Sequence, residues 1–410
     1  MAGSRAVRAG KMGLAALLGG LYFGLAAIMV VFDRLPVDFY HYYTAASRIQ
    51  AGQSAYLPFS LTGPSFLYHP FALSAVTWIL RFERETGYAI WIALSLAAYV
   101  AAMAALLGVT NRWLADAGGR LGLPGQLLLG AVFLGFRPLL QTFKQGQINL
   151  FVLLAIALCL YFSEAERPHL AGFFLGLAAI LKLSPALLFL YFLAVRRYRT
   201  VATGALTVIG LSLVAWAQFG SQVFLDFAAT VGILMGQTHM ARANHSLSVY
   251  LINALGGVNP TGMLGAVVIY GPKLILWGVA GLGAALAWWP GGDQAWQQGS
   301  TGRTARLWLF ALLVTVMTLS SPLVWAHHLT FLVIPLLLLL ARQETRWWGA
   351  GLVFLFQIEP LLGGLLAPVW VAGTALVAGE VLVLAGVTAL CLRSLTAGQR
   401  RQQADPARAG

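Results

Sequence analysis

The chain has 410 residues, of which 59% are hydrophobic and only 10% are charged. A soluble domain normally carries about 25% charged residues, so this composition excludes an ordinary water-soluble protein. The formal net charge of +13 is typical of cytoplasmic loops near anionic lipid headgroups rather than of nucleic-acid binding, because much of the basic excess lies in short connectors and the C-terminal tail.

Twelve apolar blocks follow one another along the chain, and most are long enough to cross about 30 Å of hydrocarbon. They lie near residues 12–32, 66–82, 87–109, 125–142, 146–162, 169–195, 200–219, 263–289, 305–320, 323–341, 347–360 and 367–393. The predicted fold class is therefore an all-α polytopic membrane protein with ten to twelve transmembrane helices. The first block is longer than the about 7–15 apolar residues of a signal peptide, so we expect an uncleaved span with a cytoplasmic N-terminus.

Two connectors are much longer than the others, at residues 33–65 and 220–262. If every block crosses the membrane, both lie outside, whereas the basic segments "RRYR" and "RQETR" and the C-terminal tail lie inside. We expect residues 1–393 to form one membrane domain, followed by a polar cytoplasmic tail at 394–410. The charges do not determine the threading of residues 66–195, where a proline inside the sixth block also allows half-helices.

The first long connector contains "LPVDFYHYYTAASRIQAGQSAY", which has the spacing of a helix lying along the membrane surface. Asp38, Tyr42, Ala45 and Ile49 fall on one face, and Tyr43 lies beside them. The tyrosine rings would pack on apolar surface while their hydroxyls stay in water. A carboxylate at this level can meet a substrate whose tail is in the bilayer and whose headgroup is in water. The alternative is that Asp38 only caps the helix.

Three histidine-containing segments interrupt the apolar pattern and are candidates for the same site. They contribute Tyr68 and His69 in "LYHPF", Asn244 and His245 in "NHSLSVYLINAL", and His327 and His328 in "SPLVWAHHL". Adjacent histidines inside an apolar helix are costly unless they line a cavity or find partners, so we expect a functional pair, with a satisfied core pair as the alternative. No further ligand follows at helical spacing, and both cysteines lie inside apolar blocks, so neither a metal site nor a disulfide is indicated.

Two lysines occupy positions that call for an anion. Lys182 lies near the middle of an apolar block, just before Pro185, and a lipid phosphate would neutralise its ammonium. Lys144 in "FKQGQINL" is a second candidate phosphate ligand. The neighbouring Gln147 and Asn149 are expected to orient hydroxyls of a polar ligand.

The other charges in or near apolar blocks have simpler interpretations. Snorkelling toward the headgroups accounts for Lys273. Glu164, like most of the acids, lies in a short connector, and we expect it to be solvated. Glu359 and Glu380 fall in or near the last two blocks, and each is a candidate intramembrane carboxylate, although each is alone in the sequence.

Taken in order, these segments resemble glycosyltransferase family 87. The stretch "VDFYHYYTAASRIQAGQSAY" is similar to the family's D-F-x-x-Y-Y-x-A-A segment. Four more agree with the family in kind and order: "YHPF", "GQINL", "AGFFLGLAAILKLSPALLFLYFLAVRRYR" and "SPLVWAHHL". The segment "NHSL" is similar to the family's N-Q-S-L, with His245 in place of the usual glutamine, and this departure leaves its role open.

The resemblance implies a C-type glycosyltransferase fold and mannosyl transfer from polyprenyl-phosphate mannose. It also implies that Asp38 is the catalytic carboxylate and that His327 and His328 belong to the active site. The expected location is the extracytoplasmic face of the cell membrane. The acceptor varies within the family, and we expect a glycolipid or a polysaccharide.

The predicted reaction is a direct displacement at the anomeric carbon, with inversion. Asp38 takes the proton of the acceptor hydroxyl, while Lys182, Lys144 and a protonated histidine of the 327–328 pair stabilise the leaving phosphate. The predicted substrate-binding set is Lys182, Lys144, Gln147, Asn149, Tyr42, Tyr43, Tyr68, His69, Asn244 and His245. A single phosphodiester carries less charge than a nucleotide diphosphate, so we expect neither a metal nor another cofactor, and no nucleic-acid partner.

Other classes of membrane protein fit parts of the pattern. A transporter or flippase for a polar lipid or a small anion would use Lys182, Glu359 and Glu380 as its path, although no inverted repeat is evident. A non-catalytic scaffold would leave so many polar residues in lipid unexplained. Within the enzyme class, the transferred sugar is mannose by resemblance, with arabinofuranose, glucose or another hexose as alternatives.

Overall fold

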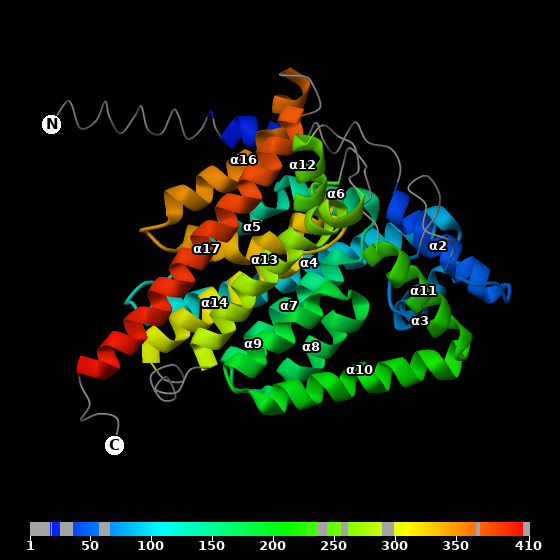
Figure 1. The fold of residues 1–410 in the computed structure, drawn as a ribbon, viewed down its shortest axis with the longest axis horizontal. Helices are drawn as coiled ribbons and strands as arrows, with labels where there is room; N and C mark the ends of the chain where they lie inside the picture. The colour runs from blue at the N-terminus through cyan, green and yellow to red at the C-terminus, as the bar shows by residue number, and fades with distance from the viewer. Residues whose placement is uncertain are drawn as a thin grey trace.

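The computed structural model describes residues 17, 19–24, 36–56, 66–236, 244–255, 261–288, 299–365 and 370–404 (Figure 1). Within these ranges the secondary structure is helical, with no strand. Five described helices are long and apolar enough to cross a membrane, or six if one bent pair counts as a single span. The predicted all-α membrane fold is therefore confirmed. The count of ten to twelve spans stays a prediction, because the first block lies largely outside the described residues.

Figure 1 shows the described helices, which are joined by short connections between residues 66 and 236. In chain order they are α2 (Val37–Gln50), α3 (Pro70–Val76), η1 (Thr77–Arg81), α4 (Arg84–Ala115), α5 (Leu123–Leu134), α6 (Arg137–Gln145), α7 (Asn149–Glu164), α8 (Pro168–Leu181), η2 (Ser184–Leu187), α9 (Leu188–Ala194), α10 (Tyr198–Phe219), α11 (Gln222–Gly236), α12 (Leu247–Ala254), α13 (Gly262–Trp288), α14 (Gly299–Leu319), η3 (Ala326–Leu332), α15 (Val333–Ala341), α16 (Arg346–Leu365) and α17 (Trp370–Ala404). The last helix continues into the predicted polar tail.

Several predicted blocks are broken helices, and the breaks bring polar residues to the site. The block at 125–142 divides into α5 and α6, which meet at an angle of 59°. Pro138 starts α6, where a missing N–H costs nothing. The block at 169–195 ends its α-helix at Leu181, and Lys182 continues in extended conformation before Pro185 enters a 3₁₀ turn. The half-helix that Pro185 allowed is therefore present in this block.

Close helix packing holds the middle of the molecule together. A Cβ atom on Gly172 of α8 would lie 2.6 Å from the Thr200 carbonyl oxygen of α10, and one on Gly176 would lie 2.5 Å from the Gly204 carbonyl oxygen. Glycines at this spacing let two membrane helices approach until their backbones touch. Since α7 packs on both α4 and α8, this close pair fixes one wall of the site.

Arginines gather at one end of the bundle. Arg303 lies 2.6 Å from Asp116 and 3.2 Å from Glu164, and Arg306 also lies 3.2 Å from Glu164. The Glu164 side chain is only 2% exposed, so its interpretation as a solvated connector charge is wrong. Asp116 follows the C-terminal end of α4, whose 32 residues span about 48 Å. The N-terminal end of α4 packs beside α2, because Gly87 contacts Phe39. The basic end and the α2 end are therefore on opposite sides of the molecule.

Candidate active site

The surface helix α2 carries Asp38 in its first turn. Pro36 occupies the N-cap position, and no side chain caps the helix, so Asp38 does not act as its cap. The predicted face is confirmed, since Tyr42 and Ala45 are buried. The Asp38 side chain is 18% exposed, which leaves part of the carboxylate accessible. Its place in the first turn also favours a negative charge, because the positive end of the helix dipole lies there.

Two tyrosines and a glutamine form a cluster one turn along α2 from Asp38. The hydroxyl oxygens of Tyr42 and Tyr68 lie 3.0 Å apart. They lie 3.1 and 2.9 Å from Oε1 of Gln147, and the backbone N–H of Ile148 donates to the Tyr42 hydroxyl at 3.1 Å. Gln147 lies in the turn after α6, where Gly146 adopts φ 65° and a Cβ would come 2.7 Å from Phe39. A glycine is required there, and it brings Gln147 to α2.

A chain of hydrogen bonds continues from this cluster to the histidine pair. Nε2 of Gln147 lies 3.3 Å from Nε2 of His327. Asn149 Nδ2 donates to the His327 carbonyl at 2.9 Å, and Lys182 Nζ donates to Asn149 Oδ1 at 2.9 Å. Side chains separated by up to 180 residues are therefore joined in one network. Gln147 and Asn149 use their amides within this network, so they position charged and titratable groups.

The hydrogen bonds of the two histidines indicate their proton positions. The Gln147 amide nitrogen is a donor, so the Nε2 atom of His327 that it approaches is the acceptor. Nδ1 of His328 lies 2.8 Å from the Leu323 carbonyl, which can only accept, so this Nδ1 carries the proton. The His327 ring is therefore neutral, and the centroids of the two rings lie 4.6 Å apart. The Lys182 ammonium is a cation of this network, and the expected contribution of a protonated histidine of the pair stays a prediction.

The electrostatics of the cluster suit Asp38 to accept a proton. Burial raises the pKa of Asp38 to about 6, while the hydrogen bond from Gln147 and the charge of Lys182 lower it. A base works best when its pKa lies near the working pH, and Asp38 is ionised but moderately basic at neutral pH. His41, one turn along α2, places Nδ1 3.9 Å from the Asp38 carboxylate. Sequence reasoning missed His41, although its i, i+3 spacing to Asp38 was a signal.

The remaining predicted residues lie at the edge of this network. His69 caps α3 by accepting from the Phe71 N–H at 3.2 Å, and its ring packs on Phe224 and Phe227. Lys144 lies in the last turn of α6, and Tyr43 is partly buried on α2. These positions do not show a substrate contact, so their binding roles stay predictions.

The segment after residue 243 supports the histidine pair from outside. The Asn244 side-chain oxygen accepts from the Val324 N–H at 3.0 Å, and the His245 N–H donates to the Val324 carbonyl at 2.7 Å. These bonds hold the extended segment before η3 in place. The pair itself lies in the 3₁₀ turn of η3, which corrects the expectation of adjacent histidines inside an apolar α-helix. Asn244 therefore has a positioning contact here.

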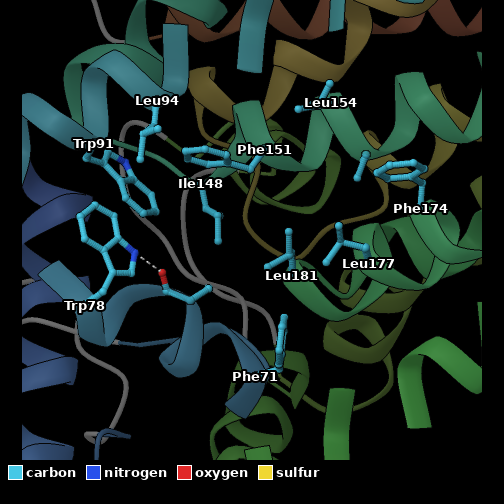
Figure 2. A pocket seen from close by; sticks show the side chains of 12 residues that line it. Phe71, Trp78, Trp91, Leu94, Ile148, Phe151, Leu154, Phe174, Leu177 and Leu181 are labelled. Carbon is cyan, nitrogen blue, oxygen red and sulfur yellow. Dashed lines mark hydrogen bonds between the residues drawn. The ribbon is translucent and has the colours of Figure 1, made fainter. Parts of the chain in front are cut away.

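Figure 2 shows the side chains that line an apolar pocket of about 340 Å³. Its walls come from α3, η1, α4, α7 and α8, and its lining residues include Trp78, Trp91, Phe151, Phe174, Leu177 and Leu181. Trp91 also packs against Tyr42, with ring centroids 5.6 Å apart. Leu181 immediately precedes Lys182. Trp91 therefore contacts both the pocket and Tyr42, and Leu181, which lines the pocket, precedes Lys182 in the chain.

The comparison with known proteins identifies the chain's family. The model of glycosyltransferase family 87 matches residues 66–322, which is more than half of the chain. The chain belongs to glycosyltransferase family 87. The predicted family is therefore confirmed. The matched range contains Tyr68, Gln147 and Lys182, but it includes neither Asp38 nor the histidine pair, so their roles remain predictions. The C-type fold implied by the family resemblance also stays a prediction.

Characterised relatives in this family share about a quarter to a third of their aligned residues with the chain. A polyprenol-phosphate-mannose-dependent alpha-(1-2)-phosphatidylinositol pentamannoside mannosyltransferase of Mycolicibacterium smegmatis is 30% identical over 60% of this chain. A protein of the same description from Mycobacterium tuberculosis is 26% identical over 67% of this chain. The chain spans 57% and 61% of the lengths of these two relatives.

Proposed function

We propose that this family-87 member transfers mannose from polyprenyl-phosphate mannose to a hydroxyl group of a lipid-linked acceptor, with inversion at the anomeric carbon. The observation that carries the proposal is the partly exposed Asp38 carboxylate in one network with the Lys182 ammonium, next to an apolar pocket. This arrangement combines a base, a phosphate ligand and a place for a lipid tail. All three are needed for a donor that is both a lipid and a phosphate ester.

The donor is expected to enter with its polyprenyl chain in the apolar pocket. The lining is apolar throughout, and a volume of about 340 Å³ suits several carbons of an isoprenoid chain but no headgroup. Lys182 follows the pocket-lining Leu181 in the chain, and we expect its ammonium to bind the phosphate that follows the lipid tail. The relatives' dependence on polyprenol-phosphate mannose supports this assignment.

The reaction we propose is a single displacement. The acceptor oxygen forms a bond to the anomeric carbon as the bond from that carbon to the phosphate oxygen breaks. Asp38 takes the proton of the acceptor hydroxyl, and the departing phosphate keeps the electron pair. The Lys182 ammonium stabilises the charge that develops on that phosphate. Because a β-linked donor is attacked from the opposite face, the product is α-linked.

We also propose that the site faces the outside of the cell membrane. The arginine-rich end is expected to lie in the cytoplasm by the positive-inside rule, and α4 separates that end from α2 by about 48 Å. The two long connectors then lie at the outer end, near Asp38 and the histidine pair. A glycolipid acceptor would reach this end from the outer leaflet, and the phosphatidylinositol mannosides acted on by the relatives support an acceptor of this class.

The transporter reading is less well supported. It requires Lys182, Glu359 and Glu380 in one path. Lys182 bonds to Asn149 of α7, whereas Glu380 is buried in α17, which packs on α14 and α16. The Glu359 side chain lies outside the described residues.

One experiment separates the two readings. Purified protein in lipid nanodiscs is incubated with polyprenyl-phosphate mannose carrying a radiolabelled sugar, together with a lipid extract of the host. Label appearing in a new glycolipid supports the proposal. The same protein in sealed vesicles tests the transporter, because uptake of label without transfer would contradict the enzyme.

A further inference from the structure

Lys273 is an intramembrane cation that the proposed reaction does not use. It lies in α13, a helix long and apolar enough to span the membrane, and it is only 9% exposed. Its Nζ atom lies 5.6 Å from the centroid of the Tyr270 ring. In the part of the chain that the structure describes, no carboxylate forms an ion pair with it. An ammonium removed from water needs an anionic partner. The partial negative charge on the face of an aromatic ring compensates it only in part.

The depth of Lys273 places its ammonium near the outer headgroups. At the inner end of α13, Arg196 donates to the Trp288 carbonyl at 3.1 Å and lies over its ring, as expected at a basic membrane interface. Lys273 is 15 residues above Trp288, or about 22 Å along the helix. The hydrocarbon layer is about 30 Å thick, so the Cα atom falls short of its outer boundary by roughly 8 Å. A lysine side chain leans toward the N-terminus of its helix, here outward, and its four-carbon stem covers most of that distance.

The surroundings of Lys273 lie on a different side of the active site from the apolar pocket. Ile269, one turn outward on α13, accepts a hydrogen bond from Ser248 of α12 at 3.2 Å. Helix α12 begins directly after Asn244 and His245, which bond to Val324 just before the histidine pair. The pocket, in contrast, is enclosed by α3, η1, α4, α7 and α8. A lipid bound beside α12 and α13 would therefore approach the histidine pair without competing for the pocket.

We propose that Lys273 binds the phosphate of an anionic lipid in the outer leaflet. Val267 and Leu274, 60% and 66% exposed, provide apolar helix surface for its acyl chains. The Tyr270 ring lies over the ammonium at the headgroup side and is itself 44% exposed. Such a lipid is either the anionic acceptor of the reaction or a resident lipid that is not consumed. Lipid binding at Lys273 stands without the proposed function, whereas the choice of the outer leaflet and the acceptor assignment rest on it.

The first test measures lipid binding alone. The full chain is purified in a neutral detergent and titrated with phosphatidylinositol, with phosphatidylcholine or with inorganic phosphate, and bound lipid is counted by native mass spectrometry. We expect phosphatidylinositol to be retained selectively and Lys273→Gln to weaken it by roughly tenfold or more, since a charge-assisted contact is lost. Lys273→Arg keeps the charge and should retain binding. Arg81→Gln, which removes an exposed cation on η1, is the matched control and should leave binding unchanged.

The outcomes separate the explanations. Equal phosphatidylinositol binding by the wild type and Lys273→Gln, with both proteins folded by thermal shift, overturns the proposal. Competition by inorganic phosphate at similar concentration also overturns it, because the site would then be a free-anion site. In a transfer assay, a Lys273→Gln variant with a raised KM for acceptor and an unchanged KM for donor identifies the lipid as the acceptor. Lost lipid binding with both constants unchanged identifies a resident lipid. If the wild type transfers no sugar at all, the proposed function fails while the lipid-binding result stands.

Discussion

The two ends of the bundle each hold a carboxylate near cations, but they use it differently. Glu164 at the basic end is 2% exposed, and Arg303 and Arg306 each lie 3.2 Å from it. Asp38 at the α2 end is 18% exposed, and the Nδ1 atom of His41 lies 3.9 Å from its carboxylate. The oxygens of an acid that bonds to two guanidinium groups are occupied in holding helices together. An acid that is held in place and only loosely paired has an oxygen available to a bound hydroxyl group.

This difference predicts that removing basicity from Asp38 has the largest effect. Asp38→Asn keeps the size and polarity of the side chain, and α2 does not depend on it for a cap. Loss of a positioned base typically lowers the rate by about 10²–10⁴. We expect transfer to fall by this factor while the melting temperature stays near that of the wild type. A fully active Asn variant would show that Asp38 is not the base.

Removing the Lys182 ammonium from the network that contains Asp38 should have the next largest effect. Lys182→Met keeps the apolar stem but removes the ammonium that bonds to Asn149. Preorganised charge at a developing oxyanion is worth about 10²–10³ in rate. We expect a loss in this range in single-turnover assays, with partial recovery in Lys182→Arg. Unchanged donor binding and turnover in the Met variant would mean that Lys182 does not bind the donor phosphate.

The carboxylate at the basic end should respond in stability instead of activity. Glu164→Gln removes the carboxylate charge that lies 3.2 Å from Arg306, whose side chain is 8% exposed. Breaking a buried ion pair typically costs about 3–5 kcal/mol, so the melting temperature in detergent should fall clearly. Glu85→Gln is the matched control, because Glu85 pairs with Arg84 on the surface and is 74% exposed. Equal melting temperatures for the two variants would mean that the buried cluster does not stabilise the bundle.

The smallest of the four effects is the pH dependence of transfer. The base acts only when ionised, and the pKa of Asp38 is raised to about 6 by burial. The rate should therefore be flat above about pH 7 and should fall about tenfold per pH unit below the pKa. The measurement is the rate constant of one turnover between pH 5 and 8. A profile that stays flat down to pH 5 would indicate that Asp38 is ionised by a stronger partner or is not the base.

Much of the site was predictable, because its residues interrupt an otherwise apolar pattern. The helix around Asp38 followed from its spacing, and the break near Lys182 followed from Pro185. The apolar pocket was not predictable, because Trp78, Trp91 and Phe174 are ordinary core residues in sequence. Only the packing of four chain segments turns them into one surface. The burial of Glu164 was not predictable for the same reason. A charge at a helix end is solvated unless another helix covers it, and only the packing brings α14 over Glu164.

The sequence by itself determined the membrane class, the helical fold and the set of polar residues with a functional role to explain. It could do so because 59% hydrophobic residues with 10% charge can be satisfied only in lipid, and because a polar group in lipid needs a partner. Only the tertiary structure decided which partners meet. Asp38, Gln147, Lys182 and His327 are joined by hydrogen bonds and charge across nearly 300 residues. Such long-range pairing depends on how broken helices and close-packed glycines bring the segments together, and no local pattern encodes it.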